Sequence, residues 1–141
     1  MRLVLPIVVF ITLAISSAAA QTGEPGPIRS SPAYAEALLR KTELQAELEA
    51  SLATYTEANP RILDLRFELA SIERFIEKLF AVKPTETAKL TLALGKLIVK
   101  RAAVETEYNR LGRSYNADHP EVKRAKRRLE IFDAAISEIL K

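Results

Sequence analysis

The sequence contains the same short motif twice, sixty residues apart. The first copy is Tyr55-Thr-Glu-Ala-Asn-Pro-Arg-Ile62, and the second is Tyr115-Asn-Ala-Asp-His-Pro-Glu-Val122. Proline has no N–H, and its φ is fixed near the helical value. It therefore suits the first position of a helix, and it ends any helix that precedes it. Each copy predicts a corner at which one helix ends and the next begins.

A residue suited to cap the outgoing helix stands directly before each proline. Asn59 can accept hydrogen bonds from the exposed N–H groups of the first turn. His119 is predicted to do the same at the second corner, with Asp118 as an alternative. We expect each tyrosine ring to pack over its corner against Ile62 or Val122. The predicted corner residues are Tyr55, Asn59, Pro60, Tyr115, His119 and Pro120.

Apolar residues follow each corner at steps of three and four, the pattern of a helix with one buried face. After the first corner they are Ile62, Leu65, Leu69, Ile72, Ile76 and Leu79. After the second they are Val122, Ala125, Leu129, Phe132, Ile136 and Ile139, at the same places plus sixty. We interpret residues 32–81 and 87–141 as two copies of an antiparallel helical hairpin, joined by a linker at 82–86. The predicted fold is all-α, as a four-helix bundle or an extended coiled coil.

The segments before the corners are also predicted to be helical. The first begins at Ser31-Pro32 and runs to about Tyr55, and the second runs from about Glu86 to Tyr115 with Thr85 as its cap. The expected inward residues are Tyr34, Ala37 or Leu38, Leu44, Leu48 and Tyr55 in the first, and Leu90, Leu94, Leu97, Val104, Tyr108, Leu111 and Tyr115 in the second. Residues 90–99 are apolar on more than one side, so a buried strand is the alternative there.

Residues 1–20 have the features of a secretory signal peptide: a basic start at Arg2, an apolar stretch from Leu3 to Ile15, and small residues up to Ala20. An uncleaved membrane anchor is the alternative. Residues 21–31 are rich in Gly, Pro and Ser and predict a flexible leader. The chain has no cysteine, so its stability has to come from helix packing. We therefore expect a secreted, periplasmic protein with no stable membrane span after cleavage.

The two hairpins differ on one face of the helix that follows the corner. In the first hairpin, Leu63, Phe67 and Ala70 form a second apolar face. The equivalent residues of the second hairpin are Lys123, Arg127 and Glu130. Either the helix of residues 62–79 lies centrally in the fold, or its extra apolar face binds another chain.

A dense basic run lies in the last predicted helix and comprises Lys123, Arg124, Lys126, Arg127 and Arg128. These side chains avoid the apolar seam, as ordinary solvated residues do. The alternative is an anionic partner such as a lipid head group, an acidic glycan or an acidic protein surface. Aromatic residues that would stack on bases are not interleaved, so no nucleic acid is expected. Lys41 and Arg101 lie at or beside inward positions, where they either reach water along their stems or pair across helices.

Catalytic and metal-binding motifs are not found in the sequence, which has a single histidine. We therefore expect no enzyme and no cofactor. The predicted function is a scaffold or adaptor of the cell envelope that acts through protein–protein contacts, with another envelope protein or with itself. One alternative is a small periplasmic holdase chaperone. Another is a protein that binds anionic envelope polymers through the basic helix.

The Tyr-x-x-x-(Asn/His)-Pro-x-(Ile/Val) corner resembles one in the periplasmic helical parts of polysaccharide chain-length determinant and exopolysaccharide export proteins. The resemblance covers Tyr55–Ile62 and Tyr115–Val122. The sequence departs from that family because it lacks the flanking transmembrane helices and the rest of the periplasmic domain. The resemblance implies an envelope setting and a helical-hairpin scaffold.

Overall fold

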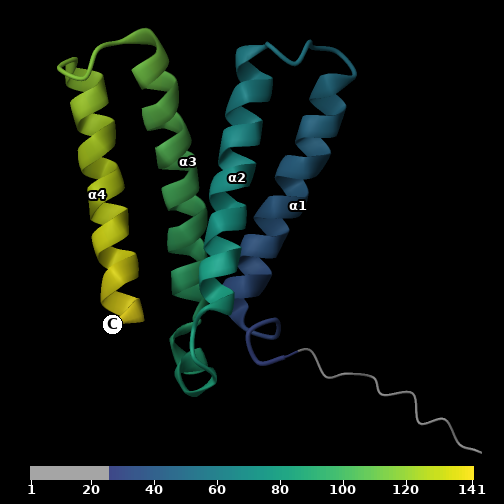
Figure 1. Ribbon diagram of the computed structural model, residues 1–141, viewed down its shortest axis with the longest axis vertical. Coiled ribbons are helices and arrows are strands. Elements are labelled where there is room, and N and C mark those ends of the chain that lie inside the picture. Colours follow the sequence, from purple (N-terminus) through teal and green to yellow (C-terminus); the bar gives the residue numbers. More distant parts are fainter. Residues whose placement is uncertain (1–25) are drawn as a thin grey trace, which may run out of the picture.

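The computed structural model describes residues 26–141, which form four long α-helices and one short 3-10 helix (Figure 1). The elements are α1 (Pro32–Leu52), α2 (Pro60–Phe80), η1 (Pro84–Lys89), α3 (Leu92–Ser114) and α4 (Pro120–Leu140). No strand occurs among these residues, so the predicted all-α fold is confirmed and the alternative strand at residues 90–99 is wrong. The predicted signal peptide, residues 1–20, and the start of the predicted leader lie outside the described residues.

Both corners have the same backbone geometry. The φ and ψ angles are −62° and 134° at Asn59, and −59° and 136° at His119. The side chain of Asn59 accepts a hydrogen bond from the N–H of Arg61 at 2.9 Å. Nδ1 of His119 accepts one from the N–H of Glu121 at 3.3 Å. The predicted caps are therefore confirmed, and they lie sixty residues apart.

Replacing Asn59 by alanine should lower the free energy of unfolding by about 1 kcal/mol, because the N–H of Arg61 loses its acceptor. Asn59→Asp should keep most of the stability, since a carboxylate accepts from the same N–H and favours the positive end of the helix. Urea unfolding of the two variants checks this. Equal losses in both would show that Asn59 does not act as a cap.

The corner tyrosines do not pack as predicted. Tyr55 is 44% exposed and Tyr115 is 47% exposed, and the ring of Tyr115 stacks on that of His119 with 4.0 Å between centroids. The prediction placed both rings in the last turn of the incoming helices. These helices end earlier, at Leu52 and Ser114, so the rings lie beyond the packed helical surface.

The caps at the start of α1 and α3 are also sixty residues apart. Oγ of Ser31 accepts from the N–H of Tyr34 at 3.3 Å, and Oγ1 of Thr91 accepts from the N–H of Leu94 at 3.2 Å. Thr85 is therefore not the cap of α3. Residues 84–89 form a 3-10 helix instead, so the connection extends to Thr91 and is longer than the predicted linker at 82–86.

Part of the predicted leader belongs to the fold. Residues 26–30 lead through turns into α1, and the N–H of Ser31 donates to the carbonyl oxygen of Ile28 at 3.1 Å. The side chain of Ile28 packs against the hydrophobic core. The described part of the predicted flexible leader, residues 26–30, thus contacts the core through Ile28.

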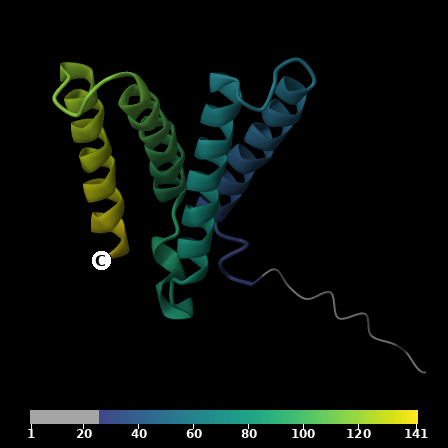
Figure 2. The same ribbon diagram turned by 45° about the horizontal axis from the view of Figure 1, so that its top comes forward.

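The helices form two antiparallel hairpins that lie side by side, with both corners at one end and η1 at the other (Figure 1). Helices α2 and α3 lie in the middle, as the view in Figure 2 also shows. Helix α3 packs against α1 and α2 as well as α4, whereas α4 packs chiefly against α3. The four helices therefore form an open bundle.

The predicted seams of α2 and α4 contribute to the core together with residues of α1 and α3. In α2 the seam residues Ile62, Leu65, Ile72 and Leu79 are buried, and in α4 Val122, Ala125 and Ile136 are buried. The remaining seam residues, Leu69, Ile76, Leu129, Phe132 and Ile139, are half-buried. In α1 the inward residue is Ala37, whereas Leu38 is 42% exposed.

An equivalent ion pair joins the two helices of each hairpin. Nζ of Lys41 lies 2.9 Å from Oε1 of Glu73, and Nε of Arg101 lies 2.6 Å from Oδ1 of Asp133. The partners in the two pairs are again sixty residues apart. Their agreement indicates that both copies fold with the same helix register, which the periodicity alone does not determine.

The two hairpins approach each other closely at Gly95. A Cβ atom added to Gly95 would lie 2.8 Å from Cβ of Glu36 and 2.9 Å from Cα of Ala33. The N–H of Ala33 donates to the carbonyl oxygen of Leu90 at 3.2 Å at the same crossing. Since only a hydrogen atom fits there, the backbones of α1 and α3 are nearly in contact.

A buried carboxylate lies between α1 and α2. Glu68 is only 8% exposed, and its Oε1 accepts from Nε and Nη2 of Arg40 at 2.9 and 2.7 Å. Burial lowers the pKa of Arg40, but the hydrogen bonds and charges of Glu68 and Glu43 outweigh it, so the pKa is raised overall.

Candidate functional site

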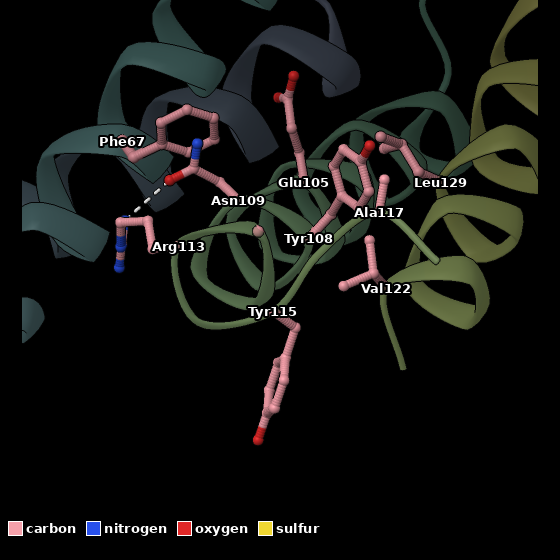
Figure 3. Close-up of a pocket in the computed structure, with 10 residues that line it drawn as sticks. Phe67, Glu105, Tyr108, Asn109, Arg113, Tyr115, Ala117, Val122 and Leu129 are labelled. Atoms are coloured by element: carbon pink, nitrogen blue, oxygen red, sulfur yellow. Dashed lines mark hydrogen bonds between the residues drawn. The ribbon is translucent and has the colours of Figure 1, made fainter. Parts of the chain in front are cut away.

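One concave site is a groove on the second hairpin, with a volume of about 470 Å³. It lies near the second corner, between α3 and α4, with Phe67 of α2 at its side (Figure 3). Its lining residues are Phe67, Glu105, Tyr108, Asn109, Gly112, Arg113, Tyr115, Ala117, Val122 and Leu129. We call it the second-hairpin groove.

Apolar side chains form much of this groove. Phe67 comes from α2, Tyr108 from α3 and Leu129 from α4, and the close-up shows Tyr108 next to Leu129 (Figure 3). Tyr115 points away from the other lining residues. At Gly112 an added Cβ would meet nothing within 4 Å, so the missing side chain leaves space in the groove.

The charged residues of the second-hairpin groove already have partners. Arg113 pairs with Asp64 of α2 and donates to Oδ1 of Asn109 at 2.8 Å. Glu105 accepts from the hydroxyl of Ser71 and from Nη2 of Arg74, the latter at 3.2 Å. These contacts link α3 to α2 and leave the apolar lining as the surface available to a ligand.

Arg101 also contacts the first hairpin, through the ring of Phe75. Its Nη1 donates to Glu105 at 2.6 Å, and its guanidinium carbon lies 5.0 Å from the ring centroid of Phe75 in α2. Burial lowers the pKa of Arg101, but the carboxylates of Asp133 and Glu105 raise it by more than burial lowers it. The pKa of Arg101 is therefore raised overall. The predicted alternatives for Arg101 are thus resolved: it pairs across helices.

The first hairpin has a groove at the equivalent place, with a volume of about 800 Å³. Its lining residues are Gln45, Leu48, Glu49, Leu52, Ala53 and Leu69. Adding sixty to each number gives Glu105, Tyr108, Asn109, Gly112, Arg113 and Leu129, all of which line the second-hairpin groove. We call it the first-hairpin groove. Neither groove was predicted, because a groove depends on how two helices diverge and not on their periodicity.

The predicted partner face is divided by the structure. Phe67 is half-buried and lines the second-hairpin groove. Leu63 is 41% exposed and Ala70 is exposed, and neither lines a groove. Helix α2 does lie centrally, as one alternative proposed, but its second buried face contains Glu68, Ser71 and Phe75. The sequence pattern did not predict this face because two of its three residues are polar.

The five basic residues of α4 are all exposed, as a solvated face requires. Three of them pair with acidic neighbours: Lys123 with Asp118 at 3.0 Å, Arg124 with Glu121 at 2.7 Å, and Arg128 with Glu107 at 2.8 Å. Asp118 thus pairs with Lys123 while His119 caps the helix. The net positive charge that remains for an anionic partner is therefore smaller than the five basic residues alone indicate.

Within residues 26–141 no group of three or more His, Cys, Asp or Glu side chains is arranged to hold a metal ion. None of the helices described by the structure combines the length and apolar character needed to cross a membrane. Comparison with known proteins gave no match to a protein family, a curated protein or a solved structure.

Proposed function

We propose that this protein is a non-enzymatic scaffold or adaptor that binds another protein through the second-hairpin groove. The supporting observation is a groove with apolar and aromatic lining residues whose charged neighbours are already paired within the fold. Such a surface favours an apolar helix face or side chain of a partner over a charged small molecule. Phe67, Tyr108 and Leu129 are the residues that would contact it.

The placement in the cell envelope is also a proposal, and it rests on residues 1–20. If the chain is exported, the protein isolated from the periplasm of a bacterial host should begin at Gln21. N-terminal sequencing of that material provides the test. A chain that retains Met1 and sediments with membranes would indicate an anchor instead.

Phe67→Glu should abolish partner binding, because it places a charge in the apolar groove. We expect an affinity loss of at least roughly thirtyfold, as for the central residue of an interface. The measurement is crosslinking in the envelope followed by quantification of each captured protein. Phe80→Glu is the matched control, since it makes the same change at the far end of α2, outside both grooves.

Circular dichroism of both variants separates binding from folding. Loss of captured partners with Phe67→Glu, at unchanged helicity, supports the proposal. The same partners in the same amounts from Phe67→Glu and the unmodified protein would rule out the second-hairpin groove as the binding site.

A holdase chaperone is the second candidate, and one observation favours it. Leu38, Leu39 and Leu52 of α1 are exposed, which gives the first hairpin an apolar surface for unfolded chains. Suppression of aggregation of a reduced, unfolded client would support this function. No effect at several-fold molar excess would exclude it.

A further inference from the structure

The two equivalent grooves differ in what lies beside them. In the second-hairpin groove, Phe67 of α2 belongs to the lining, so the neighbouring hairpin forms one wall. The first-hairpin groove is lined by α1 and α2 and by the residue that follows α1, all from its own hairpin. Among residues 26–141, nothing occupies the corresponding place beside the first hairpin.

The same asymmetry is found along α1 and α3. Ile98 and Ala102 are fully buried on the face of α3 that packs against the first hairpin. Their equivalents in α1 are Leu38, which is 42% exposed, and Thr42, which is exposed. Helix α1 thus carries the counterpart of a contact face with nothing packed on it within residues 26–141.

Helix α4 carries the counterpart of the opposite face. In α2, Ser71 is fully buried against α3, where it donates to Glu105. Its equivalent in α4 is Ile131, which is 67% exposed. This isoleucine is largely uncovered within the described fold, whereas the serine in the equivalent contact is completely covered.

We propose that these two surfaces bind each other between copies of the chain, so that α4 of one copy docks beside the first-hairpin groove of the next. The contact repeats the one that α2 makes beside the second-hairpin groove within a single chain. This head-to-tail self-association goes beyond the proposed function and does not depend on it.

Charge complementarity supports a second copy as the occupant. Within the chain, Phe67 and Asn109 line the same groove and lie close together (Figure 3). Between copies, their equivalents Arg127 and Glu49 would meet, and both are exposed. The neutral pair of the internal contact is thereby replaced by two opposite charges, which favours this register over like-charged ones.

The contact between copies is weaker than the internal one. Ala35 of the first repeat is the equivalent of Gly95, and it carries a Cβ atom. At Gly95 a Cβ atom would collide with α1. The α1 surface must therefore stay slightly farther from the neighbouring copy. We expect a reversible association that depends on concentration and weakens with salt, and that grows or closes into a ring because the two surfaces are different.

The association is measured by sedimentation velocity over a range of protein and NaCl concentrations. The protein used is the full chain as purified from the expression host. Leu38→Lys and Ile131→Glu each alter one of the two surfaces at an exposed position, so the fold of each copy should persist. Each should raise the dissociation constant at least roughly tenfold. Leu63→Lys is the matched control, because Leu63 is 41% exposed on α2 and belongs to neither surface. Its association should be unchanged.

Mixing the variants tests the head-to-tail arrangement itself. Leu38→Lys keeps an intact α4 surface and Ile131→Glu keeps an intact α1 surface, so their mixture should form dimers that cannot grow. A chain that remains monomeric at all concentrations overturns the proposal, as does a monomeric mixture. Unchanged association of Ile131→Glu would assign the contact to the leucines of α1 alone and would equally overturn it.

Discussion

Gly95→Val should destabilise the protein by about 3 kcal/mol or more, the largest effect we expect from one added side chain. Even the Cβ atom would lie 2.8 Å from Cβ of Glu36 and 2.9 Å from Cα of Ala33. Neither atom is the end of a flexible side chain, so α1 and α3 would have to separate. Separation also exposes Ile98, which the crossing buries. The loss of free energy of unfolding is measured by urea denaturation.

Gly112→Ala is the matched control in the same helix. An added Cβ at Gly112 meets nothing within 4 Å, so this change should raise the free energy of unfolding by about 0.5–1 kcal/mol through helix propensity. Gly95→Ala should have the opposite sign, because the collision outweighs the same gain. Stabilisation by both substitutions would show that the hairpins do not cross at Gly95.

Arg40→Met should cost about 3 kcal/mol, because it leaves the carboxylate of Glu68 buried without its partner. Methionine replaces much of the volume of the arginine stem, so lost packing contributes little. Urea unfolding of the variant and of the unmodified protein measures the loss of free energy of unfolding.

The double variant Arg40→Met, Glu68→Met provides the control for this prediction. Removing both charges leaves two apolar side chains between α1 and α2, and we expect a stability close to that of the unmodified protein. A double variant as unstable as Arg40→Met alone would show that the arginine stabilises through something other than Glu68.

The sequence predicted each hairpin well because the relevant forces are local. Pro60 and Pro120 set helix starts through backbone chemistry, and Asn59 and His119 cap within two residues. The steps of three and four identified the buried seams, since periodicity depends only on neighbours in one helix. The cap of α3 was missed because both Thr85 and Thr91 suit a helix start, and local chemistry does not choose between them.

The contact between the hairpins was decided by the tertiary structure alone. Its central residues include Gly95 and Ser71, which are small or polar and do not appear in a hydrophobic pattern. Which face of α3 meets the first hairpin depends on the joint fit of all these residues, and the connection through η1 sets how the second repeat can reach that face. The sequence thus predicted two nearly equal hairpins. Their unequal environments are determined by the packing of one hairpin against the other. A single interface between two repeats buries one set of faces and leaves the equivalent set exposed.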